Sequence, residues 1–265
     1  MKILNNKTLA LMLATTAVMS GQLVADDKNK FSYTYIEGAY VHDNFNANGL
    51  TLTDRDGVGD TTDDNFGTFF DATGNGGAGR FSLALPFNSK NIGFHIVADY
   101  VQTRHYPGVD IINVAGIRAS GTVSTTQKEW RAAVGLHTKL SDKFSFFAEM
   151  GVVNTSVDFA NSVLTIDSGG TVNADLAAGN GSKMSFDGKA GVRAFVGNRF
   201  ELLAYARYNG NGRYKSSADG QSIDFSGKVV GGAGALFHFT DHLAVGLDYE
   251  FAKPGRARAV ARLSF

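Results

Sequence analysis

The architecture is decided by residues 129–153, EWRAAVGLHTKLSDKFSFFAEMGVV, in which two alternating segments flank a short joint. Apolar residues occupy every second position from Trp130 to Leu136 and again from Phe144 to Val152. Arg131 and Glu149 stand on the opposite faces of these two segments. Strict alternation is typical of a β-strand with one apolar face, so the stretch predicts two antiparallel strands joined by a tight turn.

The same alternation recurs along the rest of the chain. Each segment is close to the ~9–11 residues with which a tilted strand crosses a bilayer. Counting a first strand of less regular parity, the sequence predicts an all-β, closed antiparallel transmembrane barrel of ten strands, with eight as the alternative. The predicted strands lie around residues 31–42, 80–87, 92–100, 129–137, 144–153, 184–196, 199–208, 223–239, 243–251 and 256–265.

The connections between these segments alternate in length, which predicts the topology. Outer-membrane barrels have short periplasmic turns and long outer loops, so both chain ends are expected on the periplasmic side. The loops are rich in Gly, Ser, Thr, Asn and Asp, a composition that suits solvent exposure. Tight turns are predicted at 87–91, 141–143, 197–198 and 240–242, long loops at 43–77, 103–127, 155–182 and 209–221, and a short last loop at 252–255.

The beginning of the chain has the pattern of an export signal. Lys2 and Lys7 precede an apolar run from Leu9 to Met19, and Ala25 is a small residue before an acidic stretch. This order predicts a signal peptide over residues 1–25 and a barrel over residues 26–265. The 265-residue chain has no Cys, which excludes disulfides and a lipid-anchored lipoprotein. Its 25 basic and 25 acidic residues argue against nucleic acid as a partner.

Charged residues gather on the face of each strand opposite the apolar one. A cationic side chain at the lipid midplane would cost about 2–4 kcal/mol, so these residues are expected to point into the barrel. The interior would then be either a network of neutralising ion pairs, which we favour, or a narrow charged channel. The predicted interior charges are Arg80, Asp99, Glu129, Arg131, Glu149, Asp187, Lys189, Arg193, Glu201, Arg207, Asp224, Lys228, Asp248, Glu250, Arg256, Arg258 and Arg262.

Three of these arginines, Arg256, Arg258 and Arg262, form a positive stripe on the last strand. The stripe could select anions in a channel. We expect instead that it pairs with Asp248 and Glu250 on the preceding strand, because neighbouring strands place such residues side by side.

The first outer loop carries an acidic cluster that resembles a cation site. Asp54, Asp56, Asp60 and Asp63 alternate with glycines, and carboxylate oxygens on a flexible backbone are ligands that Ca²⁺ prefers. The match to an EF-hand loop is poor, since Val58 occupies a ligand position. The simpler interpretation is a solvated acidic loop, so the sequence predicts no cofactor, with calcium as the alternative.

An enzymatic function has little support in the sequence. Ten-stranded outer-membrane proteases place acids and a His near the loop ends of their strands, and His42 with Asp43, and His105 beyond Asp99, are the only candidates at that height. No recognisable catalytic motif surrounds them. We therefore predict a protein that is not an enzyme.

Two strands carry a family resemblance. The last one, ARAVARLSF at residues 257–265, resembles the terminal strand of outer-membrane barrels, and the opening FSYTYIEGAYV at residues 31–41 resembles the first strand of the opacity and porin-like superfamily of small outer-membrane β-barrel proteins. The resemblance implies that Leu263 and Phe265 form the signal read by the barrel-assembly machinery.

The predicted function is that of an integral protein of the Gram-negative outer membrane, exposed at the cell surface. Its interior would be ion-paired and largely plugged, and its role structural or adhesive. The expected partners are outer-membrane lipid, lipopolysaccharide and the barrel-assembly machinery. A narrow passive porin-like channel is the alternative, and a protease-type enzyme is the third.

Overall fold

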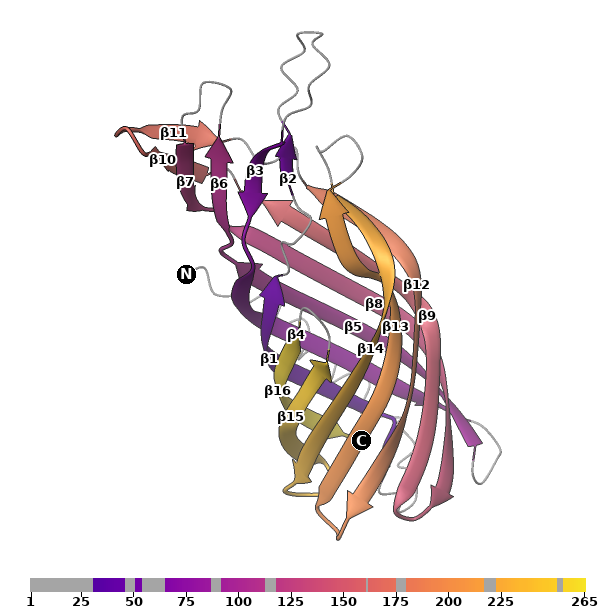
Figure 1. Ribbon diagram of the computed structural model, residues 1–265. Helices are drawn as coiled ribbons and strands as arrows, with labels where there is room; N and C mark the ends of the chain where they lie inside the picture. Colours follow the sequence, from indigo (N-terminus) through magenta and orange to yellow (C-terminus); the bar gives the residue numbers. More distant parts are fainter. Residues whose placement is uncertain are drawn as a thin grey trace, which may run out of the picture.

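The regular structure of the residues described by the computed structural model is β-strand, arranged as a closed barrel with a second, smaller sheet at one end (Figure 1). No helix in the described part of the chain is long and apolar enough to cross a membrane. The structure describes residues 31–45, 51–53, 65–86, 92–112, 118–160, 162–174, 180–216, 223–251 and 255–265.

The barrel has ten antiparallel strands, which confirms the predicted fold class and strand number. It closes between the first and last strands, with pairing that runs from Tyr35 beside Ser264 to Asp43 beside Arg256. Closure leaves no unpaired sheet edge, as a lipid environment requires. Around the barrel the order is β1 (Tyr35–Phe45), β16 (Arg256–Ser264), β15 (Leu243–Phe251), β14 (Ile223–His238), β13 (Phe200–Ser216), β12 (Gly181–Val196), β9 (Phe144–Phe159), β8 (Thr125–Ser141), β5 (Ile92–His105) and β4 (Ala72–Leu85).

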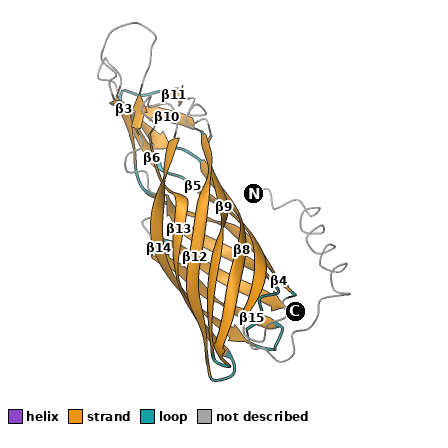
Figure 2. Cartoon of the chain, turned by 90° about the vertical axis from the view of Figure 1, so that its right-hand side faces the viewer, coloured by secondary structure: helices purple, strands orange, loops and turns teal. Residues whose placement is uncertain are grey.

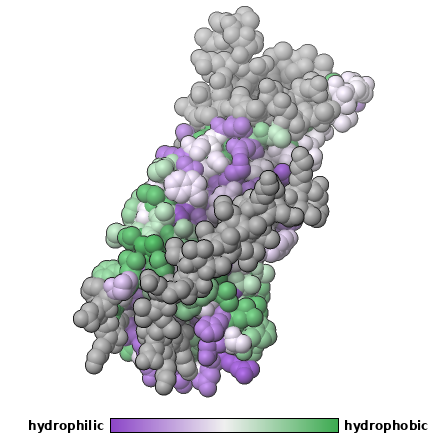
Figure 3. Space-filling view, turned by 180° about the vertical axis from the view of Figure 1, so that it is seen from behind, coloured by the Kyte–Doolittle hydropathy of each residue, from purple (hydrophilic) through white to green (hydrophobic). Residues whose placement is uncertain are grey.

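The two faces of the barrel wall differ in polarity, as strand alternation predicts. On β5, Phe94 and Ile96 are exposed on the outside, whereas His95 and Thr103 are buried inside. Large apolar side chains remain exposed over the middle of the other barrel strands as well. Figure 3 shows this surface in green over the middle of the barrel, with hydrophilic surface toward both ends.

Short turns join the strands at one end of the barrel, the lower end in Figure 2. At the β12–β13 turn, Gly197 has a positive φ of 66°, a conformation that glycine adopts without steric cost. The described chain also begins and ends here, where the Phe265 N–H donates a 3.0 Å hydrogen bond to the Thr34 carbonyl. Both described ends therefore lie at the short-turn end.

The opposite end carries a six-stranded sheet that the sequence analysis did not predict. Residues 43–77, 103–127 and 155–182 were expected to be loops, and this expectation is wrong for much of their length. Barrel strands β5 and β9 continue outward to His105 and Phe159. Beyond them the chain folds back into short paired strands: β2 (Thr51–Thr53), β3 (Asn65–Phe69), β6 (Gly108–Ile112), β7 (Arg118–Thr122), β10 (Ser162–Ile166) and β11 (Thr171–Ala174).

The first strand differs from the predicted range of 31–42. It begins at Tyr35, and its inward residues include Tyr35 and Val41, while Tyr40 is exposed outside. Residues 31–34 precede the strand, and Phe31 and Tyr33 are buried. The mixed parity of the sequence has its cause here, because the strand carries large side chains on both faces, with Tyr35 and Val41 inside and Tyr40 outside.

A second correction concerns the outer end of β14. Ile223 and Phe225 were predicted to face lipid and Asp224 to face the interior, but the two apolar side chains are buried and Asp224 is exposed. The β13–β14 pairing shifts register between Asn209 and Arg213. Across this irregularity β13 advances four residues while β14 advances two, from Lys228 to Ser226, and the inward and outward faces of β14 reverse beside it.

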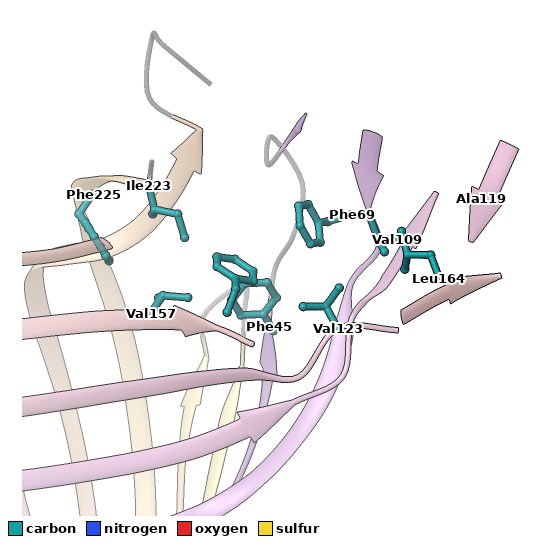
Figure 4. Close-up of a cluster of buried hydrophobic side chains, with 10 residues drawn as sticks. Phe45, Phe69, Val109, Ala119, Val123, Val157, Leu164, Ile223 and Phe225 are labelled. Carbon is teal, nitrogen blue, oxygen red and sulfur yellow. The ribbon is translucent and has the colours of Figure 1, made fainter. Parts of the chain in front are cut away.

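Two groups of buried apolar residues lie at the two ends of the barrel. The outer cluster, shown in Figure 4, lies where barrel strands meet the six-stranded sheet. It consists of Phe45, Phe69, Val109, Ala119, Val123, Val157, Phe159, Leu164, Ile223 and Phe225. The inner cluster lies near the short turns and consists of Phe31, Tyr33, Phe147, Phe195 and Tyr205.

Candidate functional site

The most distinctive region of the molecule is the charged barrel interior between the two clusters. Most of the predicted interior charges lie there and form ion pairs. Asp224 does not, since it lies on the outer face, and Lys228 is half-buried beside the irregular part of β14. The predicted residues that form ion pairs inside the barrel are Arg80, Asp99, Glu129, Arg131, Glu149, Asp187, Arg193, Glu201, Arg207, Asp248, Glu250, Arg256, Arg258 and Arg262.

Asp187 is the centre of this network. Its side chain is fully buried, and its two carboxylate oxygens accept hydrogen bonds from Arg131 Nε and, at 2.7 Å, from Arg207 Nε. Three strands thus meet at one carboxylate, because these residues lie on β8, β12 and β13. A buried charge is tolerated only when it is paired and hydrogen-bonded, and this arrangement meets both conditions.

From Arg131 the network continues toward β4, β5 and β9. Arg131 Nη1 lies 2.8 Å from Glu149 and 3.1 Å from Asp99. Arg80 then joins the same two carboxylates, at 2.8 Å from Glu149 and 3.5 Å from Asp99. Four side chains of alternating charge therefore cross this part of the interior.

From Arg207 the network continues toward the outer end. Arg207 Nη2 donates to Glu129 at 2.9 Å, and Arg256 lies 3.8 Å from Glu129 and 3.2 Å from Asp43. Asp43 also accepts a 2.6 Å hydrogen bond from His105 Nε2. This chain of contacts ends beneath the outer cluster, where Phe45 packs against His105 with ring centroids 5.5 Å apart.

A second network lies near the short turns. Arg193 Nε donates to Glu201 at 2.6 Å, and Arg262 lies 3.4 Å from Glu201 and 2.6 Å from Glu37. His238 Nε2 lies 3.0 Å from the other oxygen of Glu201. Every carboxylate of this network therefore contacts at least one guanidinium group.

The arginine stripe on β16 is distributed between these networks rather than paired with β15 alone. Arg258 pairs with Asp248 at 2.7 Å, as expected from the register. The expectation is wrong for the other two arginines. Arg256 pairs with Asp43 and Glu129. Arg262 pairs with Glu37 and Glu201. The reason is that β16 also pairs with β1, which brings acidic side chains to its other side.

The residues before β1 fold into the turn end of the barrel. The Tyr33 hydroxyl lies 2.9 Å from the Ser145 hydroxyl, and the Tyr33 carbonyl accepts a 2.7 Å hydrogen bond from Ser82. Arg193 lies over the Tyr33 ring, 4.7 Å from its centroid, and donates to the Ser32 carbonyl at 3.0 Å. The segment is thereby fixed to three different barrel strands.

Two histidines face each other beside this segment. His95 Nδ1 and His137 Nδ1 are 3.1 Å apart, and each imidazole lies against a glycine of the neighbouring strand. A Cβ at Gly135 would come within 2.3 Å of His95, and one at Gly93 within 2.4 Å of His137. The two glycines therefore provide the space that the histidine pair occupies.

Small cavities lie between the described side chains of the interior. One, of about 40 Å³, is lined by Tyr35, Lys189 and other side chains of both networks. Another, of about 50 Å³, lies among Glu129, Asn211 and Arg256. A buried water needs roughly 10–15 Å³ of such volume, so each cavity has room for only a few water-sized groups.

Further polar residues of the interior networks were not among the predicted interior charges, among them Glu37, Asp43, His95, His137 and His238. Strand parity already placed the three histidines on the inward face, but their contacts could not be foreseen. Glu37 and Asp43 were missed because the parity of residues 31–42 was ambiguous. An inward assignment for Tyr35 would have identified both, since all three positions are odd.

The proposed calcium and protease residues can be compared with the structure only in part. Asp54, Asp56, Asp60 and Asp63 lie outside the described residues, as does the signal peptide, and both remain predictions. No group of three or more metal-ligating side chains occurs among the described residues. His42 is exposed outside and contacts Asn75, whereas His105 is buried inside, so the two histidines lie on opposite sides of the wall.

The outer face of β5 and β8 marks the boundary of the apolar band. Tyr100 and Trp130 are directly paired and exposed, and beyond them Gln102 pairs with Lys128. Aromatic side chains followed by polar ones are typical of a membrane–water interface. A closed, even-stranded antiparallel barrel with an apolar outside and a charged inside is the architecture of outer-membrane proteins. The chain is an integral outer-membrane β-barrel that crosses the membrane with its strands.

The predicted assembly residues lie at the end of this barrel. Leu263 is exposed on the outer face of β16, and Phe265 follows the strand at the short-turn end. Their recognition by the assembly machinery remains a prediction.

Comparison with known proteins gives similarity to solved structures alone; no family model and no curated protein matches the sequence. Similar structures include the attachment invasion locus protein Ail of Yersinia pestis, at 13% identity and a TM-score of 0.33 over 88% of this chain and 97% of that one. Neisserial surface protein A gives 11% identity and a TM-score of 0.37 over 88% and 98%. The outer membrane protein OprG from Pseudomonas aeruginosa gives 12% identity and a TM-score of 0.39 over 90% and 99%.

Proposed function

We propose that this protein is a closed, non-conducting outer-membrane barrel that carries a β-sheet at the cell surface, where it has a structural or adhesive role. The observation that supports this function best is the occupation of the interior by paired charges. Asp187, Arg131 and Arg207 cross the middle of the barrel with hardly any exposed surface.

Apolar residues close the path on both sides of these charges. The outer cluster packs Phe45, Phe159 and Phe69 together, with neighbouring ring centroids 6.3 and 5.4 Å apart. At the other end, Phe31 packs against Phe195 at 5.0 Å. An ion would have to pass two apolar layers and break buried ion pairs between them, which argues against passive conduction.

The charge distribution also argues against a selective channel. Channels for ions of one sign use rings of like charge, whereas this interior alternates acids and arginines over contacts of 2.6–3.8 Å. Barrels of about eight strands are filled by side chains, and ten strands remain close to that size. The interior therefore suits mechanical stability better than transport.

A catalytic role is not part of the proposal. His105 and Asp43, two of the predicted protease candidates, form a pair whose side chains are both buried beneath the outer cluster. A catalytic base must reach the substrate proton directly or through one water. We therefore assign the pair a structural role at the outer end of the ion-pair network.

The outer sheet is the part of the molecule best placed to meet a partner. Strands β10 and β11 form a hairpin at its edge, joined by a turn at Gly169 and Gly170 with positive φ angles. An unpaired edge strand presents free backbone groups to other chains, which supports an adhesive function.

Replacing the hairpin of residues 162–174 by a short turn tests this role. We expect cells that display the full protein to adhere to a host-cell layer or to each other, and cells with the shortened protein to lose that adhesion. Retained heat-modifiable migration in gels would show that the shortened barrel still folds. Equal adhesion by both proteins would exclude the hairpin as the adhesive element and favour a structural role.

We also propose lipopolysaccharide as a partner at the outer boundary of the apolar band. Arg104 is exposed on the outer face of β5, and its side chain makes no hydrogen bond or ion pair with any described residue. Lys128 lies diagonally from it on β8. Exposed cations just beyond Tyr100 and Trp130 lie where lipid phosphates are expected.

A thermal unfolding measurement tests this contact. Purified lipopolysaccharide should raise the Tm of the protein in micelles, and the Arg104→Ala variant should show a smaller rise in Tm. Equal rises would exclude this contact.

A further inference from the structure

The cavity of about 40 Å³ lies between the two ion-pair networks and has an unusual lining. Lys189, Arg80 and Arg258 line it, together with Arg193 and Arg262 of the network near the turns. Its carboxylates are Glu37, Glu149 and Asp248. Cationic side chains therefore outnumber carboxylates around this small space.

Lys189 is the exception in an otherwise paired interior. Its side chain is buried, with 7% of the residue exposed, and among the described residues no carboxylate forms an ion pair with it. Its contacts are with aromatic rings, at 3.8 Å from the Tyr205 centroid and 5.9 Å from that of Phe147. An ammonium group has three N–H donors, and ring faces satisfy them only weakly.

Each arginine in the lining forms an ion pair with a carboxylate, although the Arg80 Nε–H is buried without a hydrogen-bond acceptor in the described part of the chain. Arg80 contacts Glu149 at 2.8 Å, and Arg258 contacts Asp248 at 2.7 Å. In the same way Arg262 contacts Glu37 at 2.6 Å and Arg193 contacts Glu201 at 2.6 Å. The carboxylates that line the cavity are thus already held by guanidinium groups, and Lys189 is left without a close counter-ion.

The lining contains another donor without a hydrogen-bond partner among the described residues. Tyr35 is 6% exposed, and its hydroxyl makes no hydrogen bond with any described residue. Its ring lies between two cations, 4.4 Å from Arg262 and 5.8 Å from Arg80. The Lys189 ammonium group and the Tyr35 hydroxyl therefore both have N–H or O–H donors that an acceptor in the cavity could satisfy.

We propose that this cavity binds a small monovalent anion such as chloride, held by the Lys189 ammonium group with the Tyr35 hydroxyl as a second donor. The volume admits an ion of one or a few atoms. The three carboxylates in the lining would repel a doubly charged anion at such short range. The site would complete the charge pairing of the interior without opening a path through it.

Crystals grown in sodium bromide test the site directly, because bromide scatters anomalously. We expect an anomalous peak inside the cavity beside Lys189 in the unmodified protein. An anomalous map with no peak there, in crystals that resolve ordered water in the cavity, would overturn the proposal. This measurement needs no variant, so it does not depend on how well Lys189 substitutions fold.

A stability measurement in detergent provides an independent test. The Tm of the purified protein should be a few degrees higher in chloride than in gluconate at equal ionic strength, because gluconate is too large for the cavity. Lys189→Met should abolish the difference, Tyr35→Phe should reduce it, and Lys143→Met in an exposed turn should leave it unchanged. A chloride effect that persists in Lys189→Met would contradict the site.

Discussion

Tyr33 lies flat against His137, with ring centroids 3.8 Å apart and ring planes inclined by 8°. Tyr33 precedes the first barrel strand, whereas His137 lies near the turn end of β8. The contact therefore fastens the chain before the barrel to the inside of the wall. It also makes the beginning of the described chain part of the closure of the barrel.

Tyr33→Ala should destabilise the barrel strongly, because it removes a buried ring and leaves a cavity. Losses of about 3–5 kcal/mol in the free energy of unfolding are typical of such changes. Tyr33→Phe keeps the ring stacking and removes the hydroxyl contact with Ser145, so we expect a loss of about 0.5–1.5 kcal/mol in the free energy of unfolding. Denaturant unfolding followed by the fluorescence of the single Trp would measure both. Equal losses for the two variants would show that the ring contact contributes nothing.

Asp187→Asn should be among the most damaging substitutions in the interior. It leaves Arg131 and Arg207 without their shared carboxylate, and breaking a buried pair typically costs about 3–5 kcal/mol. Asp158→Asn is the matched control, because Asp158 pairs with Lys128 at the exposed surface and should lose less than about 1 kcal/mol. Similar unfolding midpoints for both variants would argue that the central network does not stabilise the barrel.

Gly135→Ala should disturb the histidine pair. The added Cβ would come within 2.3 Å of the His95 ring, and forcing a methyl group into a packed core costs about 1–3 kcal/mol. Gly38→Ala on β1 is the control, since a Cβ there meets nothing within 4 Å. Unfolding measurements on the two variants should therefore differ. Equal stability of Gly135→Ala and Gly38→Ala would contradict the close packing of the His95 ring against Gly135.

Val134→Lys tests the position of the lipid band. Val134 is 59% exposed in the middle of β8, and a Lys at the lipid midplane costs about 2–4 kcal/mol. The Thr126→Lys substitution, on the outer side of the Tyr100–Trp130 pair, should cost less than about 1 kcal/mol. Refolding into lipid bilayers followed by unfolding would compare the two variants, and equal costs would place the membrane boundary elsewhere.

The barrel wall could be predicted because one rule governs it. Every second side chain meets lipid, so alternation identifies the strands and the inward charges without knowledge of their partners. The rule fails where the wall is irregular. The register shift at Asn209 and Arg213 reverses the faces of Ile223 and Phe225, and nothing in the alternation indicates where such a shift occurs.

The remaining differences arise where burial no longer depends on lipid. Phe31 and Tyr33 fill the barrel interior at the short-turn end. The strands that carry Val109 and Leu164 each pair with β7 above the barrel and contribute to the outer cluster. The partners of each charge are likewise a property of the closed barrel. Arg262 pairs with Glu37 only because the last strand closes on the first, a contact between residues far apart in sequence.

Single-channel conductance in a planar bilayer tests the central claim, that the interior is closed, most directly. We expect no conductance steps after insertion has been verified independently, for example by protease protection of the barrel. Removing part of the inner cluster in a Phe31→Ala/Tyr33→Ala variant should leave the bilayer silent as well, because the central ion pairs and the outer cluster remain. Stable, reproducible steps from the unmodified protein would contradict the account and establish a narrow channel.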